Sequence, residues 1–300
     1  MKKNGIIKLI MAMTLMAALG LMTGCGKSEK TAESVIETET VEETEEVIEL
    51  VQIAPEQEVI NLMLVGQDRR ENDGRSRSDA MILITLNRTE QTLDMTSFMR
   101  DTYVQIPEWG GNRLNAAYVF GGMELMRDTF RENFGVEIDG IIEVDFFEFT
   151  DIINMLGGID IEVNEDEAEI IGCEPGYVHL DGKQALSYCR IRKVGRGDFE
   201  RTERQRRVMS ILFEKALNMT TNEVMECVDQ FFLQVTTDMT QDDLFNLALE
   251  VMLLGIDSME THNIPEDAGY SSETVDGMSV LVPNLDACRG LMEEITTISE

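Results

Sequence analysis

The sequence predicts an α/β fold, with helices packed on a central sheet, for the region from residue 58 to residue 300. Short apolar runs rich in β-forming residues alternate there with segments whose apolar residues recur at helical spacing. This alternation is typical of an α/β domain or an α/β/α sandwich. The region is long enough for one large domain with a full core, or less favourably two small ones, and no internal repeat is visible.

Residues 1–24 have the layout of a secretory signal, with three lysines and an apolar run from Leu9 to Met22. Small residues end this run immediately before Cys25, an arrangement similar to the cleavage box of bacterial lipoproteins, so we expect Cys25 to carry a lipid. The alternative is an uncleaved anchor, but the run is shorter than the roughly 20 residues that a membrane-spanning helix needs. Either interpretation places the protein on the outer face of a membrane.

Residues 25–57 are rich in Glu and Thr and poor in large apolar residues, so they cannot bury a core. We interpret them as an acidic, flexible tether that like-charge repulsion keeps extended. An acidic binding tail is the alternative.

The first predicted strands are Val59–Val65, Ala80–Leu86 and Leu93–Met99, which would form the centre of the sheet. A helix is predicted over Leu114–Phe134, with a break at Gly121-Gly122.

The next elements are a strand at Ile141–Val144, a helix at Phe146–Leu156 stopped by Gly157-Gly158, a strand at Ile159–Val163 and a short helix at Asp181–Tyr188. A long helix begins near Glu200. The last 80 residues predict two amphipathic helices, an irregular stretch through Pro265 and a closing helix after Pro283. We expect this tail, residues 218–300, to cover the sheet and to carry little chemistry.

The net charge of −32 excludes nucleic acid as a partner, because phosphate backbones bind basic surfaces. Basic residues nevertheless cluster between Arg190 and Arg207, which implies an anionic ligand of limited size. Four cysteines follow Cys25, an even number that permits up to two disulfides without specifying their pairing. Their spacing fits no zinc pattern, and we interpret them as structural or free.

Charged residues lie at the ends of the predicted apolar strands. Strand ends are the places where open α/β sheets bind ligands. Arginine matches phosphate oxygens bidentately, and five arginines that could converge suit a diphosphate. They are Arg77, Arg100, Arg190, Arg192 and Arg201. If Arg190-Ile191-Arg192 is extended, both guanidinium groups lie on one face. Arg201 and Gln205 are expected to point toward the interior, whereas Arg206 and Arg207 fall elsewhere and are candidates for simple solvation.

Asp68 and Asp79 could hold a hard divalent cation, Mg²⁺ or Mn²⁺, through carboxylate oxygens. Such an ion would neutralise charge on a leaving diphosphate. Asp198 is a candidate base or orienting group for an acceptor hydroxyl, and a helix cap is the alternative. A lipid substrate would need an apolar slot, which we expect near the Phe-rich segment after Ile141.

Seven ordered blocks between Ile60 and Leu217 resemble the LytR-CpsA-Psr phosphotransferases of the bacterial cell envelope. They are NLMLVGQDRR, RSDAMILITLN, SFMRDTYVQIP, RLNAAYVFGG, IIEVDFFEFTDIINMLGGIDIEV, HLDGKQALSYCRIRK and GDFERTERQRRVM. The sequence departs from the family pattern at Met99, Ala80 and Arg206, none of which is a proposed ligand.

The resemblance implies an α/β/α sandwich with an apolar tunnel for a polyprenyl tail. It implies transfer of a teichoic acid, capsule or other glycopolymer from a polyprenyl-pyrophosphate carrier to a peptidoglycan hydroxyl. The head group would be bound by Arg77, Arg100, Arg190, Arg192, Arg201 and Gln205. The metal would be held by Asp68 and Asp79, and catalysis would involve Asp79, Arg100 and Asp198.

Two other functions stay open from the sequence. One is a pyrophosphatase on the same lipid, in which water replaces the wall hydroxyl. The other is a non-catalytic lipid-binding or regulatory envelope protein. The acidic charge and the lack of a helix-turn-helix arrangement argue against direct DNA binding by such a regulator.

Overall fold

The computed structural model describes residue 53 and residues 56–67 and 78–296. The predicted signal segment, Cys25, most of the predicted tether, Asp68 and Arg77 lie outside the described residues. Among the helices of the described ranges, none combines the length and the apolar character needed to cross a membrane.

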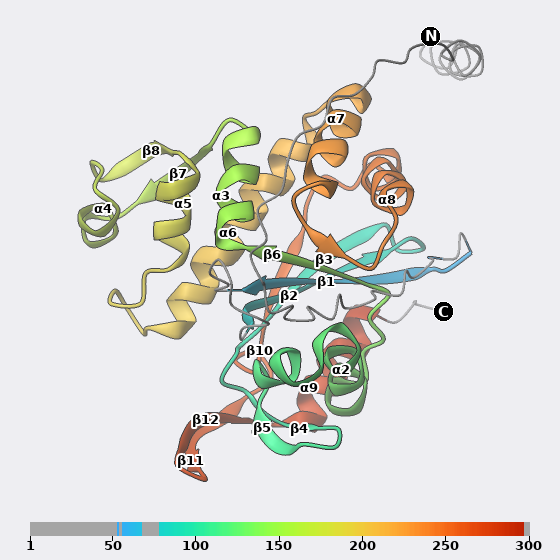
Figure 1. Ribbon diagram of the computed structural model, residues 1–300, viewed down its shortest axis with the longest axis vertical. Helices are drawn as coiled ribbons and strands as arrows, with labels where there is room; N and C mark the ends of the chain where they lie inside the picture. The colour runs from blue at the N-terminus through green and yellow to red at the C-terminus, as the bar shows by residue number, and fades with distance from the viewer. Residues whose placement is uncertain (1–52, 54–55, 68–77, 297–300) are drawn as a thin grey trace, which may run out of the picture. The chain divides into compact units, whose positions relative to one another are not determined.

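The central sheet of the described region has six strands and is mixed (Figure 1). Its order is β10 (Glu260–Ile264), β3 (Thr92–Phe98), β2 (Ser78–Asn87), β1 (Val59–Gln67), β6 (Gly140–Asp145) and β9 (Thr236–Thr237). β1 pairs with β6 and β3 with β10 in parallel, and the other neighbours are antiparallel. The predicted central mixed sheet is confirmed, and the first three predicted strands lie side by side within it.

Helices cover both faces of this sheet, which confirms the three-layer sandwich (Figure 1). Met63 and Val65 of β1 belong to the core under α2 (Ala116–Phe134) and α9 (Leu285–Thr296). Ile60, Leu62 and Leu64 alternate with them and face the opposite layer. That layer contains α6 (Asp198–Leu217), α7 (Thr221–Phe232) and α8 (Gln241–Leu254).

The middle of the chain forms a second small core against α6. Its elements are α3 (Phe146–Met155), β7 (Ile159–Val163), α4 (Glu165–Ile171), β8 (Gly176–Leu180) and α5 (Gly182–Cys189). The N-cap residues Asp145, Asn164 and Asp181 each form a capping box, so three helices begin where their sequences provide a side-chain acceptor. This core supports the start of α6, where several predicted site residues lie.

The predicted interruption of α2 is confirmed. Gly121 and Gly122 have non-helical backbone angles within this helix. Gly122 has φ 63°, a left-handed conformation that a side chain would disfavour. The glycine pair therefore lets one helix bend without ending.

The prediction of an irregular stretch through Pro265 is wrong. The chain forms β10 just before Pro265, at an edge of the central sheet, and then a hairpin of β11 (Tyr270–Val275) and β12 (Met278–Pro283). A second hairpin, β4 (Tyr103–Ile106) with β5 (Gly110–Arg113), also escaped prediction. These strands are short or polar, so their sequences lack the apolar alternation that indicates a buried strand. The two amphipathic helices and the closing helix are confirmed as α7, α8 and α9.

The four cysteines of the described region are free. Cys189 and Cys288 are buried, and Cys173 and Cys227 are partly exposed. The permitted disulfides are therefore not formed, in agreement with the interpretation of these residues as structural or free.

Candidate functional site

Asp79 lies at the centre of the candidate site. It is the second residue of β2, and the antiparallel register of β2 with β3 places it near Arg100, which follows β3. Arg100 Nη1 donates to Asp79 Oδ1 at 2.7 Å, and Arg192 Nη2 donates to Oδ2 at 3.2 Å. Three of the predicted residues thus meet although 113 positions separate Asp79 from Arg192.

Asp198 joins the same group from the start of α6. Its Oδ2 accepts a hydrogen bond from Arg201 Nη2 at 3.0 Å and lies 3.5 Å from Arg100 Nε. The N-cap is Gly197, and no side chain caps the helix. The carboxylate of Asp198 therefore faces the arginines, and the structure does not support the alternative of a helix cap.

Arg201 is the most buried cation of the group, with 2% of the residue exposed. It donates to the backbone oxygen of Asp79 at 3.0 Å as well as to Asp198. Burial lowers its pKa to about 10, although Asp198 opposes that change. Its Nε and Nη1 are buried and have no hydrogen-bond acceptor among the described residues. Buried donors without acceptors are costly, so the site is arranged for an anion that is not part of the protein.

Arg100 is held as a cation. Burial disfavours its charged form, but the carboxylates of Asp198 and Asp79 outweigh burial and raise its pKa. Asp101 lies 3.8 Å from Arg100 Nε and 3.3 Å from Arg113 Nη1. The carboxylates beside Arg100 thus neutralise part of the arginine cluster.

Arg190 and Gln205 line an apolar cavity of about 200 Å³, and so does Ala80, the residue after Asp79. The Arg190 guanidinium lies 4.3 Å from the centre of the Phe146 ring. The cavity is also lined by Phe149, so the expected apolar slot near the Phe-rich segment is present. It lies between the sheet and the helices α3, α5 and α6.

Arg190-Ile191-Arg192 is not extended, so the condition for both guanidinium groups to lie on one face is not met. Arg190 has φ −98° and ψ −2°, and its N–H donates to the carbonyls of Leu186 and Ser187. The helical turn of α5 therefore continues through Arg190, because those carbonyls still offer acceptors. As a result Arg190 stacks on Phe146 while Arg192 reaches Asp79.

A second apolar cavity, of about 300 Å³, lies farther along the same face of the sheet. Leu64 of β1 and Ile82 of β2 line the first cavity. Leu62 and Ile84, which lie two residues farther along their strands, line the second. The two cavities therefore follow one another under α6, starting at the arginine group.

Two other arginines of the cluster between residues 190 and 207, Arg204 and Arg196, have structural partners. Arg204 is buried and pairs with Glu167 at 2.7 Å. Arg196 pairs with Glu200 and with Glu266 of the tail, so the tail does contribute to this cation cluster. Sequence spacing alone did not distinguish these cations from those of the site.

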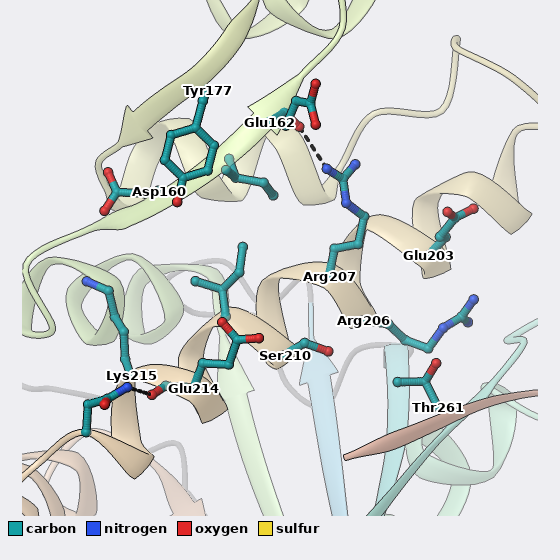
Figure 2. Close-up of a pocket in the computed structure, with 13 residues that line it drawn as sticks. Asp160, Glu162, Tyr177, Glu203, Arg206, Arg207, Ser210, Glu214, Lys215 and Thr261 are labelled. Carbon is teal, nitrogen blue, oxygen red and sulfur yellow. Dashed lines mark hydrogen bonds between the residues drawn. The ribbon is translucent and has the colours of Figure 1, made fainter. Parts of the chain in front are cut away.

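Arg206 and Arg207 line an open groove of about 790 Å³ between α6 and the hairpin of β7 and β8 (Figure 2). Arg207 donates to the Tyr188 hydroxyl and to the backbone oxygen of Glu162, and burial lowers the pKa of Arg206. Neither is simply solvated, so that expectation is wrong. The groove is larger than the apolar cavities, but Asp79, Arg100 and Arg201 do not line it.

Asp79 is a carboxylate of the type that hard divalent cations bind, but in this structure both of its oxygens accept hydrogen bonds from arginines. Its predicted partner in metal binding, Asp68, lies outside the described residues.

The family model for the LytR_cpsA_psr family matches residues 21–296. The chain belongs to the LytR_cpsA_psr family. This match extends through the tail, beyond Leu217, where the resemblance read from the sequence blocks ends.

Named relatives agree with the family assignment. The Bacillus cereus protein named polyisoprenyl-teichoic acid–peptidoglycan teichoic acid transferase TagU is 34% identical over 200 residues, which are 63% of this chain and 64% of that protein. The protein of the same name from Oceanobacillus iheyensis is 36% identical over 210 residues, 66% of this chain and 65% of the relative. The alignments thus span just under two thirds of these relatives.

Solved structures of the LytR_cpsA_psr family have the same fold. B. subtilis TagT is 26% identical with a TM-score of 0.67, covering 83% of this chain and 94% of TagT. TagT bound to LIIa-WTA has the same identity and coverage and a TM-score of 0.69. B. subtilis TagV is 26% identical with a TM-score of 0.68, covering 81% of this chain and 99% of TagV.

Proposed function

We propose that this protein transfers a teichoic acid or a related wall glycopolymer from a polyprenyl-pyrophosphate carrier to peptidoglycan. The observation that carries the proposal is the buried Arg201, which meets Asp79 together with Arg100 and Arg192 and has two N–H groups without a hydrogen-bond acceptor among the described residues. Such a group binds a compact polyanion. The relatives named as TagU and the structure of TagT bound to LIIa-WTA support a teichoic acid carrier as the source of that anion.

The diphosphate would lie over Asp79 and Asp198. Arg100, Arg192 and Arg201 would donate to its oxygens, with Arg77 as a further donor from the segment before β2. Arg190 and Gln205 line the 200 Å³ cavity, and the diphosphate would join the lipid beside them. The polyprenyl tail would continue through this cavity into the 300 Å³ cavity, whose lining is almost wholly apolar.

In the transfer step, the acceptor hydroxyl of peptidoglycan attacks the phosphorus that bears the glycan. A phosphorus–oxygen bond of the diphosphate breaks, and polyprenyl phosphate leaves. The hydroxyl loses a proton, for which Asp198 is the candidate acceptor, because its Oδ1 makes no hydrogen bond among the described residues. Arg100 and Arg201 hold this carboxylate in place.

Asp68 and Asp79 would hold Mg²⁺ or Mn²⁺, which would neutralise charge on the diphosphate when bound. We further propose that Cys25 carries a lipid and that the acidic tether extends the enzyme from the outer face of the cell membrane into the envelope. The anchor is tested by growing cells with a radioactive fatty acid. The protein should become labelled, and the Cys25→Ala variant should not.

The decisive experiment incubates the purified chain with a polyprenyl-pyrophosphate saccharide and measures polyprenyl phosphate by mass spectrometry, with and without Mg²⁺. We expect Mg²⁺-dependent release that falls by about 10²-fold or more in Arg100→Ala. Arg196→Ala is the matched control, because its guanidinium pairs with Glu200 and Glu266 instead of the candidate site. Lipid that binds tightly but is never cleaved would indicate a binding protein.

Adding peptidoglycan separates a transferase from a pyrophosphatase. A transferase yields glycopolymer covalently linked to peptidoglycan, whereas a pyrophosphatase yields free glycan phosphate at the same rate with or without the acceptor.

A further inference from the structure

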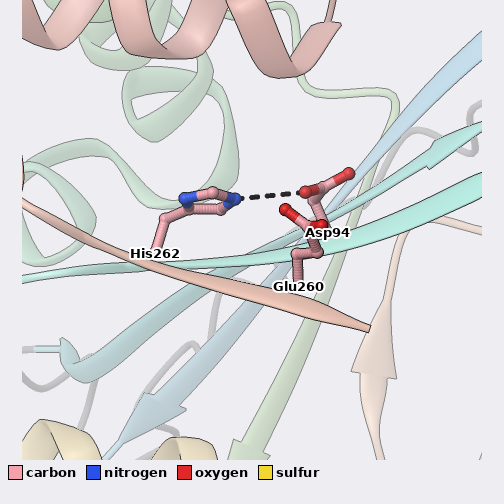
Figure 3. A group of neighbouring side chains, drawn as sticks. All are labelled: Asp94, Glu260 and His262. Atoms are coloured by element: carbon pink, nitrogen blue, oxygen red, sulfur yellow. Dashed lines mark hydrogen bonds and ion pairs between the residues drawn. The ribbon is translucent and has the colours of Figure 1, made fainter. Parts of the chain in front are cut away.

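Asp94, Glu260 and His262 form a cluster of metal-ligating side chains at the sheet edge, where β10 pairs with β3 (Figure 3). The parallel register sets Glu260 directly across from Asp94, and His262 lies two residues farther along β10. Phe98 and Ile264, on the same two strands, belong to the core under α2 and α9. Because side chains alternate along a strand, Asp94, Glu260 and His262 project toward that same face.

The ligand atoms of these three residues lie within 4.8 Å of one another. His262 Nε2 and Asp94 Oδ1 are 3.1 Å apart. A tetrahedral shell with bonds of about 2.1 Å separates its ligand atoms by about 3.4 Å. A small movement of the exposed Glu260 would therefore complete a three-ligand set around one ion.

The charges of the cluster favour a cation. Asp94 is 8% exposed, and like charges directly opposite each other on paired strands are unfavourable. The side chain of Glu260 makes no hydrogen bond within the described ranges, and the nearby His262 is the one basic group that faces both carboxylates in the cluster.

Thr96 supplies an independent observation. It is fully buried, lies two residues after Asp94 on the same face of β3, and pairs in register with His262. Its hydroxyl has no hydrogen-bond partner among the described residues. A metal ion with three protein ligands commonly holds water as its fourth, and such a water would give this buried hydroxyl a partner.

We propose that Asp94, Glu260 and His262 bind a divalent transition-metal ion, with Zn²⁺ as the ion that best fits the set. One imidazole and two carboxylates suit Zn²⁺, whereas Mg²⁺ and Ca²⁺ prefer oxygen ligands alone. Asp94 lies near the start of β3 and Arg100 follows its end, so about 20 Å of strand separates this site from the arginine group. The bound ion joins the edge strand β10, from the tail, to the neighbouring strand β3.

The test is calorimetric titration of the purified, chelator-treated full-length chain with Zn²⁺ in the presence of Mg²⁺. We expect one Zn²⁺ per chain at this site. The affinity for Zn²⁺ should fall at least about tenfold in Glu260→Gln and in His262→Gln, because each substitution removes one ligand. Zn²⁺ should also raise the thermal midpoint of the unmodified chain but not that of Glu260→Gln. Glu260 is exposed, so its replacement does not threaten folding.

Two control variants locate the bound ion. His179 pairs with Asp160 at 2.9 Å on the exposed hairpin β7–β8, and no third metal-ligating side chain of the described residues joins this pair. The variant His179→Gln should therefore bind Zn²⁺ normally. Asp79→Asn should also retain the binding. Loss of Zn²⁺ binding in Asp79→Asn, unchanged binding in Glu260→Gln and His262→Gln, or no Zn²⁺ uptake in the micromolar range would each overturn the proposal.

Discussion

Arg201 and Arg204 are neighbours on α6 and are both buried, but their surroundings differ. Arg204 Nε lies 2.7 Å from Glu167 and its Nη1 donates to the carbonyl of Ile191. Arg201 has two donors without acceptors in the described region. The first arginine stabilises the fold, and the second is available to a ligand.

This difference predicts unequal effects of two substitutions on stability. Glu167→Gln leaves Arg204 as an unpaired buried charge and should lower the free energy of unfolding by about 3–5 kcal/mol. Arg201→Met should cost clearly less, because the loss of the bonds to Asp198 and to the Asp79 carbonyl is offset by removal of two buried donors that lack acceptors, while it weakens diphosphate binding. Urea denaturation and a binding titration with inorganic pyrophosphate measure both effects. A large loss of stability in Arg201→Met would contradict the assignment of Arg201 to ligand binding.

The thiols should differ in reactivity. Burial raises the pKa of Cys189 to about 12 and that of Cys288 to about 11, and both residues are buried. Because the thiolate is the reactive form, an alkylating reagent at pH 8 should modify Cys173 and Cys227 before these two. Peptide mass mapping over time measures the order, with the urea-unfolded chain as the control in which all four react. Rapid labelling of native Cys189 would be inconsistent with the packing of α5.

At the scale of elements, the turn between α3 and β7 depends on two glycines that differ in their surroundings. Gly157 has φ 75° and Gly158 has φ 77°. A Cβ at Gly158 would lie 2.5 Å from His179 Nε2 and 2.7 Å from the backbone oxygen of Leu180, whereas a Cβ at Gly157 would meet nothing within 4 Å.

We therefore expect Gly157→Ala to cost about 1–2 kcal/mol, the backbone strain alone. Gly158→Ala should cost clearly more, because β8 must also move away. Thermal unfolding of both variants measures the difference, and equal losses would show that the close approach to His179 and Leu180 is unimportant.

The sequence predicted the elements whose own residues alternate or recur clearly, such as β1, β2 and the interrupted α2. It did not predict β10, whose residues ETHNI become a strand only because β3 offers an open edge. The same limit applies to the site. The residue types of Asp79, Arg100 and Arg201 indicated an anion site. Arg196 and Arg204 do not belong to that site because they pair with Glu266 and Glu167, which are distant from them in the chain. Long-range pairing of this kind leaves no local pattern.

At the scale of the whole molecule, two apolar cavities lie in succession between the sheet and the helices α6 to α8. Ala248 of α8 lines only the second of them. Ala248→Phe should fill that cavity, so affinity for a long polyprenyl pyrophosphate should fall while affinity for a short one stays the same. Binding titrations with prenyl chains of two lengths measure this. Equal losses for both lengths would contradict a continuous path for the tail.

The pairing of β10 with β3 also has a consequence for biosynthesis. Asp94 and His262 meet although 168 positions separate them, so a ribosome completes β3 long before it makes the strand that covers its outer edge. Until then β3 is an unpaired edge, which invites pairing with other chains. Nascent or truncated chains that end before residue 260 should therefore depend on a chaperone and aggregate without one.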